Sequence, residues 1–150
     1  MSREMVRIEQ PEHPSMNISI SGEVVKGFGR GSKELGIPTA NLEEKSAGLL
    51  ENKLKTGIYF GYSYLNGIKY PMVMSYGWNP FYKNEIRSCE VHIIAELEDF
   101  YGQVLEIQIL GYIRPELDYS GVEDLIKDIK LDIKTAVQTL ERKEYFSVSK

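Results

Sequence analysis

Cysteine and histidine are scarce in this chain of 150 residues, which limits the ways in which its fold can be stabilised. Cys89 is the only cysteine, so no disulfide can form within the chain. The two histidines, His13 and His92, stand too far apart in the sequence for a zinc motif. A hydrophobic core is therefore expected to stabilise the fold without a disulfide or a structural metal.

Long apolar runs and an excess of positive charge are missing as well. No run approaches the ~18 consecutive apolar residues of a membrane span, and the first residues lack the apolar segment of a secretion signal. The 18 Lys and Arg residues against 22 Asp and Glu residues give a net charge of −4, which disfavours general binding to nucleic acid. We expect a cytoplasmic monomer with neither a membrane nor a nucleic acid as partner.

The composition is that of a globular domain, since hydrophobic residues make up 42% of the chain. A chain of roughly 100–200 residues usually forms one domain. Residues 1–17 are polar, contain Pro11 and Pro14, and show neither helical nor strand periodicity, so we interpret them as a flexible lead-in. The domain is predicted to span residues 18–150.

Strand-like and helix-like patterns follow one another along the chain. Asn66-Gly67 separates two strand-like runs and supplies the positive φ angles of a tight antiparallel hairpin. Apolar residues recur at helical spacing over residues 122–140, and Ser120 with Glu123 forms a capping box, so one long helix is predicted there. Strands first and a helix last favour an antiparallel sheet or barrel with a helix packed outside it. Five strands, rich in Ile, Val, Tyr or Phe, are predicted at residues 18–26, 57–66, 69–76, 88–97 and 103–113.

Five glycines fall within residues 22–36. Glycine at this density is expected where the backbone turns with positive φ or approaches a ligand closely. Lys26, Arg30 and Lys33 lie in the same segment with no acid between them, so its N–H groups and cations predict a site for polyphosphate. The segment fits neither Walker A, where Lys precedes Ser or Thr, nor a Rossmann fingerprint, which needs a βαβ unit. A glycine-rich turn with solvated cations remains the alternative.

Pro38-Thr39-Ala40-Asn41 follows the glycine-rich segment directly. Thr39 and Asn41 are two residues apart, so in an extended stretch their side-chain oxygens point the same way. Two neutral oxygen donors beside phosphates suit Mg²⁺, which keeps waters and shares phosphate oxygens. The alternative is a turn closed by the Asn and Thr side chains.

The predicted strand at residues 88–97 has two distinct faces. One face, which includes Cys89 and Val91, is apolar and is predicted to be core. The opposite face carries Glu90 and His92. Glu90 is either a general base that reaches a ligand at the rim of the sheet or a solvated strand carboxylate. His92 receives no role, because a lone histidine more often packs or forms a hydrogen bond.

Six segments carry a family resemblance: Gly27-Phe-Gly-Arg-Gly-Ser-Lys-Glu-Leu-Gly-Ile-Pro-Thr-Ala-Asn41, Thr56-Gly-Ile-Tyr59, Gly77-Trp-Asn-Pro-Phe-Tyr82, Glu90-Val-His-Ile93, Asp99-Phe-Tyr-Gly102 and Gly111-Tyr-Ile-Arg-Pro-Glu116. In this order, from about Ile18 to Leu140, the chain resembles riboflavin kinase (flavokinase) of the monofunctional eukaryotic type. The resemblance implies a mainly β fold, a six-stranded antiparallel Greek-key β-barrel with a C-terminal helix outside. It also implies transfer of the γ-phosphate of ATP to the 5′-hydroxyl of riboflavin, which gives FMN and ADP.

The same resemblance implies roles for individual residues. Glu90 matches the catalytic carboxylate, and Thr39 and Asn41 match the residues that bind nucleotide and Mg²⁺ or another hard divalent cation. Arg114 and Tyr119 match flavin contacts in a mobile loop ahead of the helix. The residues matched to ATP binding are Gly27, Gly29, Arg30, Gly31, Ser32, Lys33, Thr39, Asn41, Ile93 and Tyr101.

Two other functions are weighed against the kinase. A small barrel that binds single-stranded nucleic acid through aromatic residues needs a long basic track, whereas Lys and Arg cluster here only in the glycine-rich segment. A flavin- or nucleotide-binding module without turnover fits the same motifs, but it has no need for a carboxylate at position 90. Glu90 therefore favours the kinase over the non-catalytic module.

Overall fold

The computed structural model describes residues 16–25, 39–78, 87–95, 97, 100–116 and 121–141. The predicted lead-in lies almost wholly outside these residues, so the predicted domain limits remain a prediction. In chain order the described elements are β1 (Ile18–Val25), β2 (Thr39–Leu42), α2 (Glu44–Gly48), β3 (Gly57–Leu65), β4 (Ile68–Trp78), β5 (Arg87–Ile93), β6 (Val104–Arg114) and α3 (Val122–Leu140).

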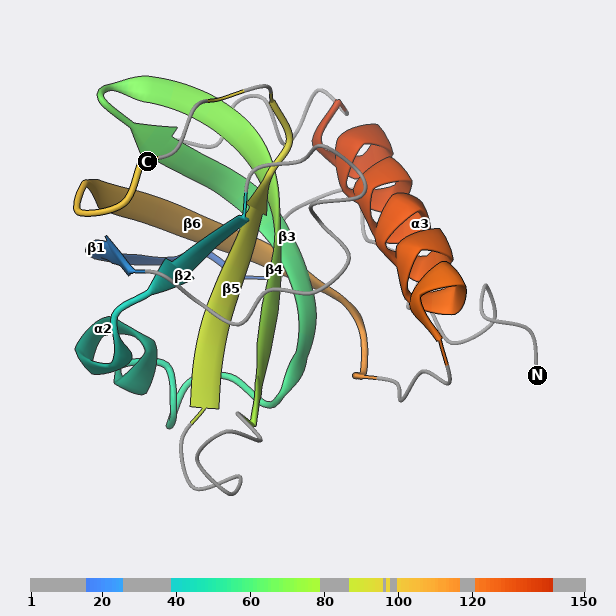
Figure 1. Ribbon diagram of the computed structural model, residues 1–150, viewed down its shortest axis with the longest axis horizontal. Coiled ribbons are helices and arrows are strands. Elements are labelled where there is room, and N and C mark those ends of the chain that lie inside the picture. The colour runs from blue at the N-terminus through green and yellow to red at the C-terminus, as the bar shows by residue number, and fades with distance from the viewer. Residues whose placement is uncertain are drawn as a thin grey trace.

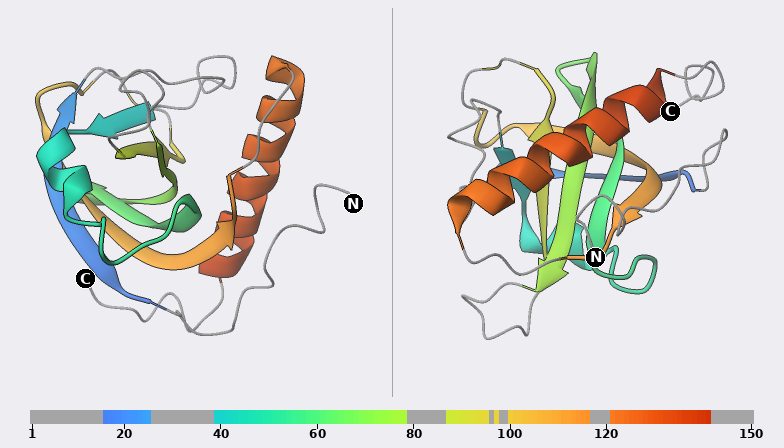
Figure 2. Two further views of the ribbon diagram at one scale, coloured as in Figure 1. Left: turned by 90° about the horizontal axis from the view of Figure 1, so that it is seen from below. Right: turned by 90° about the vertical axis from the view of Figure 1, so that its right-hand side faces the viewer.

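The six strands form a closed barrel in the order β1-β2-β5-β4-β3-β6, and every neighbouring pair is antiparallel. Helix α3 lies outside the barrel along one side of it, as the two views of Figure 2 show together with Figure 1. The predicted fold, a six-stranded antiparallel barrel with an external C-terminal helix, is confirmed. Among the described residues, no helix is both long enough and apolar enough to span a membrane.

The five strands predicted from the patterns correspond to β1, β3, β4, β5 and β6. The hairpin between β3 and β4 turns at Asn66 and Gly67, whose φ angles are 52° and 79°, as the turn prediction required. Strand β2 supplies the sixth strand and shows that Thr39 to Asn41 are extended rather than in a turn. Neither β2 nor the short helix α2 was predicted from periodicity.

Helix α3 spans the predicted residues, but the predicted capping box at its start is wrong. The N-cap is Gly121, in an extended conformation and with no side-chain hydrogen bond, while Ser120 lies outside the described residues. Glu123 and Asp124 stand in the first turn. Carboxylates at this end of a helix interact favourably with its dipole, so charge takes the place of a capping hydroxyl.

Two apolar clusters pack on the two sides of the barrel wall. The inner cluster fills the barrel and includes Cys89, Val91 and Ile93, so the predicted core face of β5 is confirmed. The outer cluster lies between the wall and α3. Its members from the strands and the helix include Phe60, Val73, Leu110, Ile113, Ala136 and Leu140. The outer surface of this wall is therefore buried where α3 covers it.

Candidate active site between the barrel and helix α3

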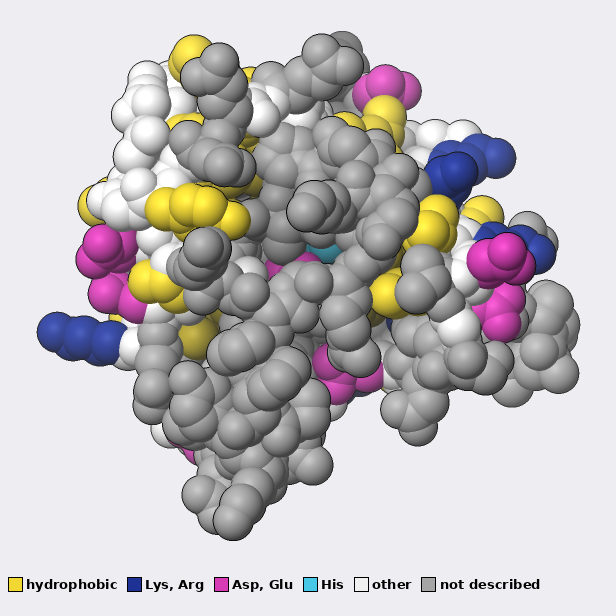
Figure 3. Space-filling model, in the orientation of Figure 1, with side chains coloured by type: hydrophobic (Ala, Val, Ile, Leu, Met, Phe, Trp, Pro, Cys, Tyr) yellow, Lys and Arg dark blue, Asp and Glu magenta, His cyan; other side chains and the backbone are white. Residues whose placement is uncertain are grey.

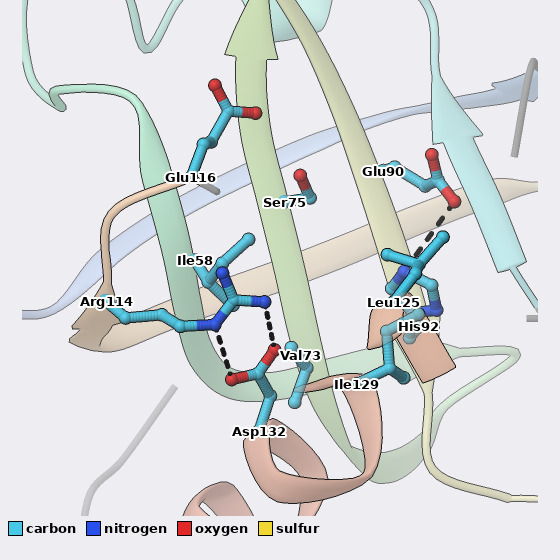
Figure 4. Close-up of a pocket in the computed structure, with 10 residues that line it drawn as sticks. All are labelled: Ile58, Val73, Ser75, Glu90, His92, Arg114, Glu116, Leu125, Ile129 and Asp132. Carbon is cyan, nitrogen blue, oxygen red and sulfur yellow. Dashed lines mark hydrogen bonds and ion pairs between the residues drawn. The ribbon is translucent and has the colours of Figure 1, made fainter. Parts of the chain in front are cut away.

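A pocket of about 110 Å³ lies outside the barrel, between strands β3, β4 and β5 and helix α3 (Figure 4). In the space-filling view, a histidine and an acidic side chain are visible at the base of a hollow on this face (Figure 3). Apolar and polar side chains both line the pocket. The apolar ones are Ile58, Val73, Leu125 and Ile129, and the polar ones are Ser75, Glu90, His92, Arg114, Glu116 and Asp132.

Strand pairing sets three polar residues in a row across the barrel wall. Asn41 of β2 is the partner of Glu90 in β5, and Glu90 on its other side is the partner of Ser75 in β4. Residues directly opposite each other in an antiparallel pair project from the same face, with Cβ atoms roughly 4.5–5.5 Å apart. The Glu90 carboxylate is therefore flanked by an amide and a hydroxyl on the outer face of the barrel.

Glu90 and His92 lie on this outer face two residues apart, and their side chains point toward each other (Figure 4). The distance from His92 Nε2 to Glu90 Oε1 is 3.6 Å, and the exposed fractions of the side chains are 8% for His92 and 21% for Glu90. Burial lowers the pKa of His92 to about 4, so its ring is neutral near pH 7. A neutral ring can donate a hydrogen bond to the carboxylate but forms no ion pair with it.

Arg114 and Asp132 form a buried ion pair at the other side of the pocket (Figure 4). Arg114 Nε donates to Asp132 Oδ1 at 2.9 Å, and Nη2 donates to Oδ2 at 2.8 Å. Because Arg114 ends β6 and Asp132 belongs to α3, the pair fixes the helix against the barrel. This corrects the expected place of Arg114, which belongs to a strand rather than to a mobile loop: its backbone is paired with Ile58 of β3, and its guanidinium is held by Asp132.

Glu116 contributes a second carboxylate to the pocket wall. It lies so close to Gly77 of β4 that a Cβ atom at position 77 would collide with its carboxylate. Glycine at this position therefore leaves room for the Glu116 carboxylate against β4.

Comparison with known proteins identifies the family. Residues 14–140 match the family model described as Flavokinase: Riboflavin kinase. The chain belongs to the riboflavin kinase family. The riboflavin kinase of Homo sapiens is 47% identical to it over 129 residues, which cover 85% of this chain and 83% of the human protein. The resemblance carried by the six sequence segments is thereby confirmed.

Solved structures agree on the fold of this riboflavin kinase family member. The crystal structure of riboflavin kinase from Trypanosoma brucei has a TM-score of 0.64 at 24% identity and covers 85% of this chain and 79% of that chain. A crystal structure titled as a macrolide-efflux protein from Streptococcus pneumoniae has a TM-score of 0.67 at 28% identity. It covers 81% of this chain, which spans only 38% of that longer protein.

The structure brings some of the predicted site residues together and leaves others apart. Glu90 and Arg114 line the pocket, and Asn41 adjoins Glu90. Ile93 is fully buried inside the barrel, and Tyr101 is 50% exposed in the turn before β6, so neither side chain lines the pocket. The predicted residues outside the described part of the chain are Gly27, Gly29, Arg30, Gly31, Ser32, Lys33 and Tyr119.

The structure of this riboflavin kinase family member describes the residues on either side of the segment 26–38, which holds four of the five glycines. Val25, just before it, is paired with Asn41, and Thr39, just after it, is paired with His92. The described strand after residues 26–38, β2, therefore adjoins the strand of Glu90 and His92, and the strand before them, β1, lies one strand further away.

Sequence reasoning missed three polar residues of the pocket: Ser75, Glu116 and Asp132. A signal existed for Asp132, which lies three residues after Ile129 and four before Ala136, inside the apolar stripe of the helix. A charge in such a stripe needs a buried partner. Ser75 and Glu116 carry no comparable signal, because their place depends on strand pairing and on the close approach at Gly77.

Proposed function

We propose that this chain transfers the γ-phosphate of ATP to the 5′-hydroxyl of riboflavin and forms FMN and ADP. The observation that carries the proposal is the place of Glu90, a partly exposed carboxylate in a pocket of a chain of the riboflavin kinase family. Glu90 accepts the proton of the 5′-hydroxyl of riboflavin. The oxygen of that hydroxyl bonds to the γ-phosphorus of ATP, and the bond from the γ-phosphorus to the ADP oxygen breaks. Most of the remaining catalysis is positioning and charge stabilisation.

Riboflavin is proposed to bind in the pocket between the barrel and α3. The apolar side chains of Ile58, Val73, Leu125 and Ile129 suit a flat ring system, and polar groups fix its orientation. Arg114, which was predicted to contact flavin, lines the same pocket. Tyr119 keeps its predicted flavin contact as part of this proposal.

ATP and Mg²⁺ are proposed to bind beside β2. Among the described residues, no group of three or more His, Cys, Asp and Glu side chains is arranged to hold a metal ion. A site that shares the phosphate oxygens needs fewer protein ligands, and the half-buried Asn41 beside Glu90 supplies a neutral oxygen of the kind that Mg²⁺ accepts. Thr39 and Asn41 would hold the ion, which neutralises charge on the phosphates. The residues proposed to bind ATP are those predicted above, from Gly27 to Tyr101.

A direct assay tests the proposed function. Purified protein is incubated with riboflavin and Mg-ATP, and FMN and ADP are separated by chromatography; equal amounts of the two products are expected. Binding of riboflavin without any FMN would instead indicate the non-catalytic module and overturn the proposal. Asn41→Ala is expected to raise the Mg²⁺ concentration needed for half-maximal rate, and an unchanged Mg²⁺ titration would remove Asn41 from the metal site.

The surroundings of the protein follow from the same proposal. We propose that the chain acts as a monomer in the cytoplasm with riboflavin, FMN, ATP and ADP as its small-molecule partners. Size-exclusion chromatography with light scattering checks the monomer, and cell fractionation checks the location.

A further inference from the structure

On the outer face of β5, the side chain of His92 is more buried than that of Glu90, and the proposed reaction assigns His92 no role. Its imidazole is 8% exposed and contacts the Glu90 carboxylate, which is 21% exposed. The backbone of His92 is paired with Thr39 on one side and with Val73 on the other, so the ring is anchored on a strand in the middle of the wall. A rigid buried group beside a more exposed one is suited to hold it in place.

We propose that His92 is a positioning residue for Glu90. Its Nε2–H donates to Glu90 Oε1 and thereby directs the other carboxylate oxygen to the hydroxyl that is to be phosphorylated. This inference rests on the proposed function, because it assigns His92 a task in the same reaction. It depends on an N–H at Nε2 and not on a change in the charge of the ring.

The geometry supports a contact that shortens during the reaction. The 3.6 Å between His92 Nε2 and Glu90 Oε1 is longer than a hydrogen bond of roughly 2.7–3.2 Å. Contacts between catalytic side chains are often long outside the Michaelis complex and tighten within it. Figure 4 shows the second oxygen of Glu90 pointing away from His92, so a contact between His92 and the first oxygen fixes the direction of the second.

The surroundings of the ring favour the required tautomer. His92 Nδ1 is buried and has no hydrogen-bond partner among the residues that the structure describes. The cross-strand neighbour Val73 is apolar, as are the pocket residues Leu125 and Ile129 of α3. A proton on Nδ1 would bury an unsatisfied donor and turn the Nε2 lone pair toward a carboxylate, and a proton on Nε2 avoids both costs.

Two substitutions separate positioning from packing. Glutamine keeps an N–H donor at about the reach of Nε2, whereas phenylalanine fills the site without a donor. If His92 positions Glu90, His92→Phe lowers kcat by about 10- to 100-fold with little change in KM, since a small misplacement of a catalytic group costs about 100-fold. His92→Gln then retains more of kcat than His92→Phe does. If His92 only packs, His92→Phe retains more activity than His92→Gln, because a buried amide without hydrogen-bond partners destabilises the fold and a phenyl ring does not.

A double-mutant cycle tests whether the effect passes through Glu90. In the Glu90→Gln background, His92→Phe is expected to lower the residual kcat no further. Tyr64→Phe is the matched control on the same outer face but outside the pocket lining, because it removes the hydrogen bond from Tyr64 to Gln108 Oε1 at 2.9 Å. It is expected to lower stability without changing kcat. If His92→Phe lowers kcat in the Glu90→Gln background by as much as it does in the wild-type protein, the inference is overturned.

The tautomer of His92 can be measured in the wild-type protein, so this test does not depend on whether the His92 variants fold. With only His13 and His92 in the chain, ¹H–¹⁵N correlation spectra of the imidazoles are assigned by one His13→Gln variant. A proton on Nε2 of His92 is expected, and a proton on Nδ1 alone overturns the inference.

The outcomes also distinguish this inference from the proposed function. A wild-type protein that forms no FMN overturns the proposed function and this inference with it. A wild-type protein that forms FMN, combined with a His92→Phe variant of unchanged kcat, or with equal losses for His92→Phe and His92→Gln, overturns this inference alone.

Discussion

The inner and outer faces of strand β5 are both largely buried, yet they differ in chemistry. Cys89, Val91 and Ile93 face the interior of the barrel and are fully buried among apolar neighbours. Burial raises the pKa of the Cys89 thiol, which therefore stays protonated and unreactive. Glu90 and His92 face outward, under α3, and line a pocket.

The difference shows that two kinds of burial arise on one strand. The inner face is buried by the closure of the barrel, and its side chains only pack against one another. The outer face is buried because a helix from the end of the described chain covers it, and the cover leaves a pocket open to ligands. Polar groups held in such partly dry surroundings interact more strongly than they do in water. Changes inside the barrel should therefore affect stability alone, whereas changes under α3 should also affect turnover or ligand binding.

The largest expected effect is that of Glu90→Gln on turnover. Loss of a general base is expected to lower kcat by about 10²- to 10⁴-fold while ATP affinity is kept. Steady-state FMN formation and calorimetric titration with nucleotide measure the two quantities. Val91→Ala on the opposite face is the control, expected to lower stability and to leave kcat unchanged. An unchanged kcat in Glu90→Gln would remove Glu90 from the role of base.

The second prediction concerns the ion pair that holds α3 to the barrel. Asp132→Ala leaves the buried Arg114 charge without its carboxylate, so the free energy of unfolding is expected to fall by about 3–5 kcal/mol. Urea denaturation measures this loss. The double variant Arg114→Met with Asp132→Leu should recover much of the stability without restoring flavin binding. A loss for Asp132→Ala below about 1 kcal/mol would contradict the structural role of the pair.

The third prediction concerns pH. Burial lowers the pKa of His92 in the folded chain from 6.5 to about 4, so between these values the unfolded chain binds a proton that the folded chain does not. Stability is thus fully present above pH 6.5 and is lost as the pH falls toward 4, by up to about 3 kcal/mol. Urea denaturation across this range should show a shallower pH dependence for His92→Gln. Equal pH dependence in both proteins would count against burial of the ring.

The smallest effect is expected inside the barrel. Ile107→Val removes one methyl group from a fully buried side chain of the inner cluster and should cost about 0.5–1.5 kcal/mol of stability. Thermal unfolding and the FMN assay together measure the outcome. A kcat that changes as much as in an outer-face variant would erase the distinction between the two faces.

Local patterns predicted most of the fold. Alternation and composition located five strands, and the spacing of apolar residues over 122–140 matches the bounds of α3. Strand β2 has only four residues, Thr39–Leu42, and follows Pro38, so too few positions were present for a pattern. Its extended form comes from pairing with β1 and β5, which are distant in the sequence. Long-range pairing of this kind leaves no local signal.

The site was predictable only in part. Alternation along β5 put Glu90 on the face away from the core, and the family resemblance gave it a role. That the outer face becomes a pocket could not be predicted, because Leu125, Ile129 and Asp132 reach it only when α3 docks. The partner of Arg114 was missed for the same reason, since Asp132 lies 18 positions further along the chain.

The order of the elements along the chain has a consequence for synthesis. A chain that emerges from the ribosome presents all six strands before Val122, and no strand pairing of the barrel involves a residue of α3. The barrel can close while the wall formed by Leu125, Ile129 and Asp132 is still within the ribosome. A nascent chain halted before Val122 thus contains every residue of the strand pairings but lacks one side of the pocket, so a small molecule that contacts both sides can stabilise the protein only after translation has passed the helix.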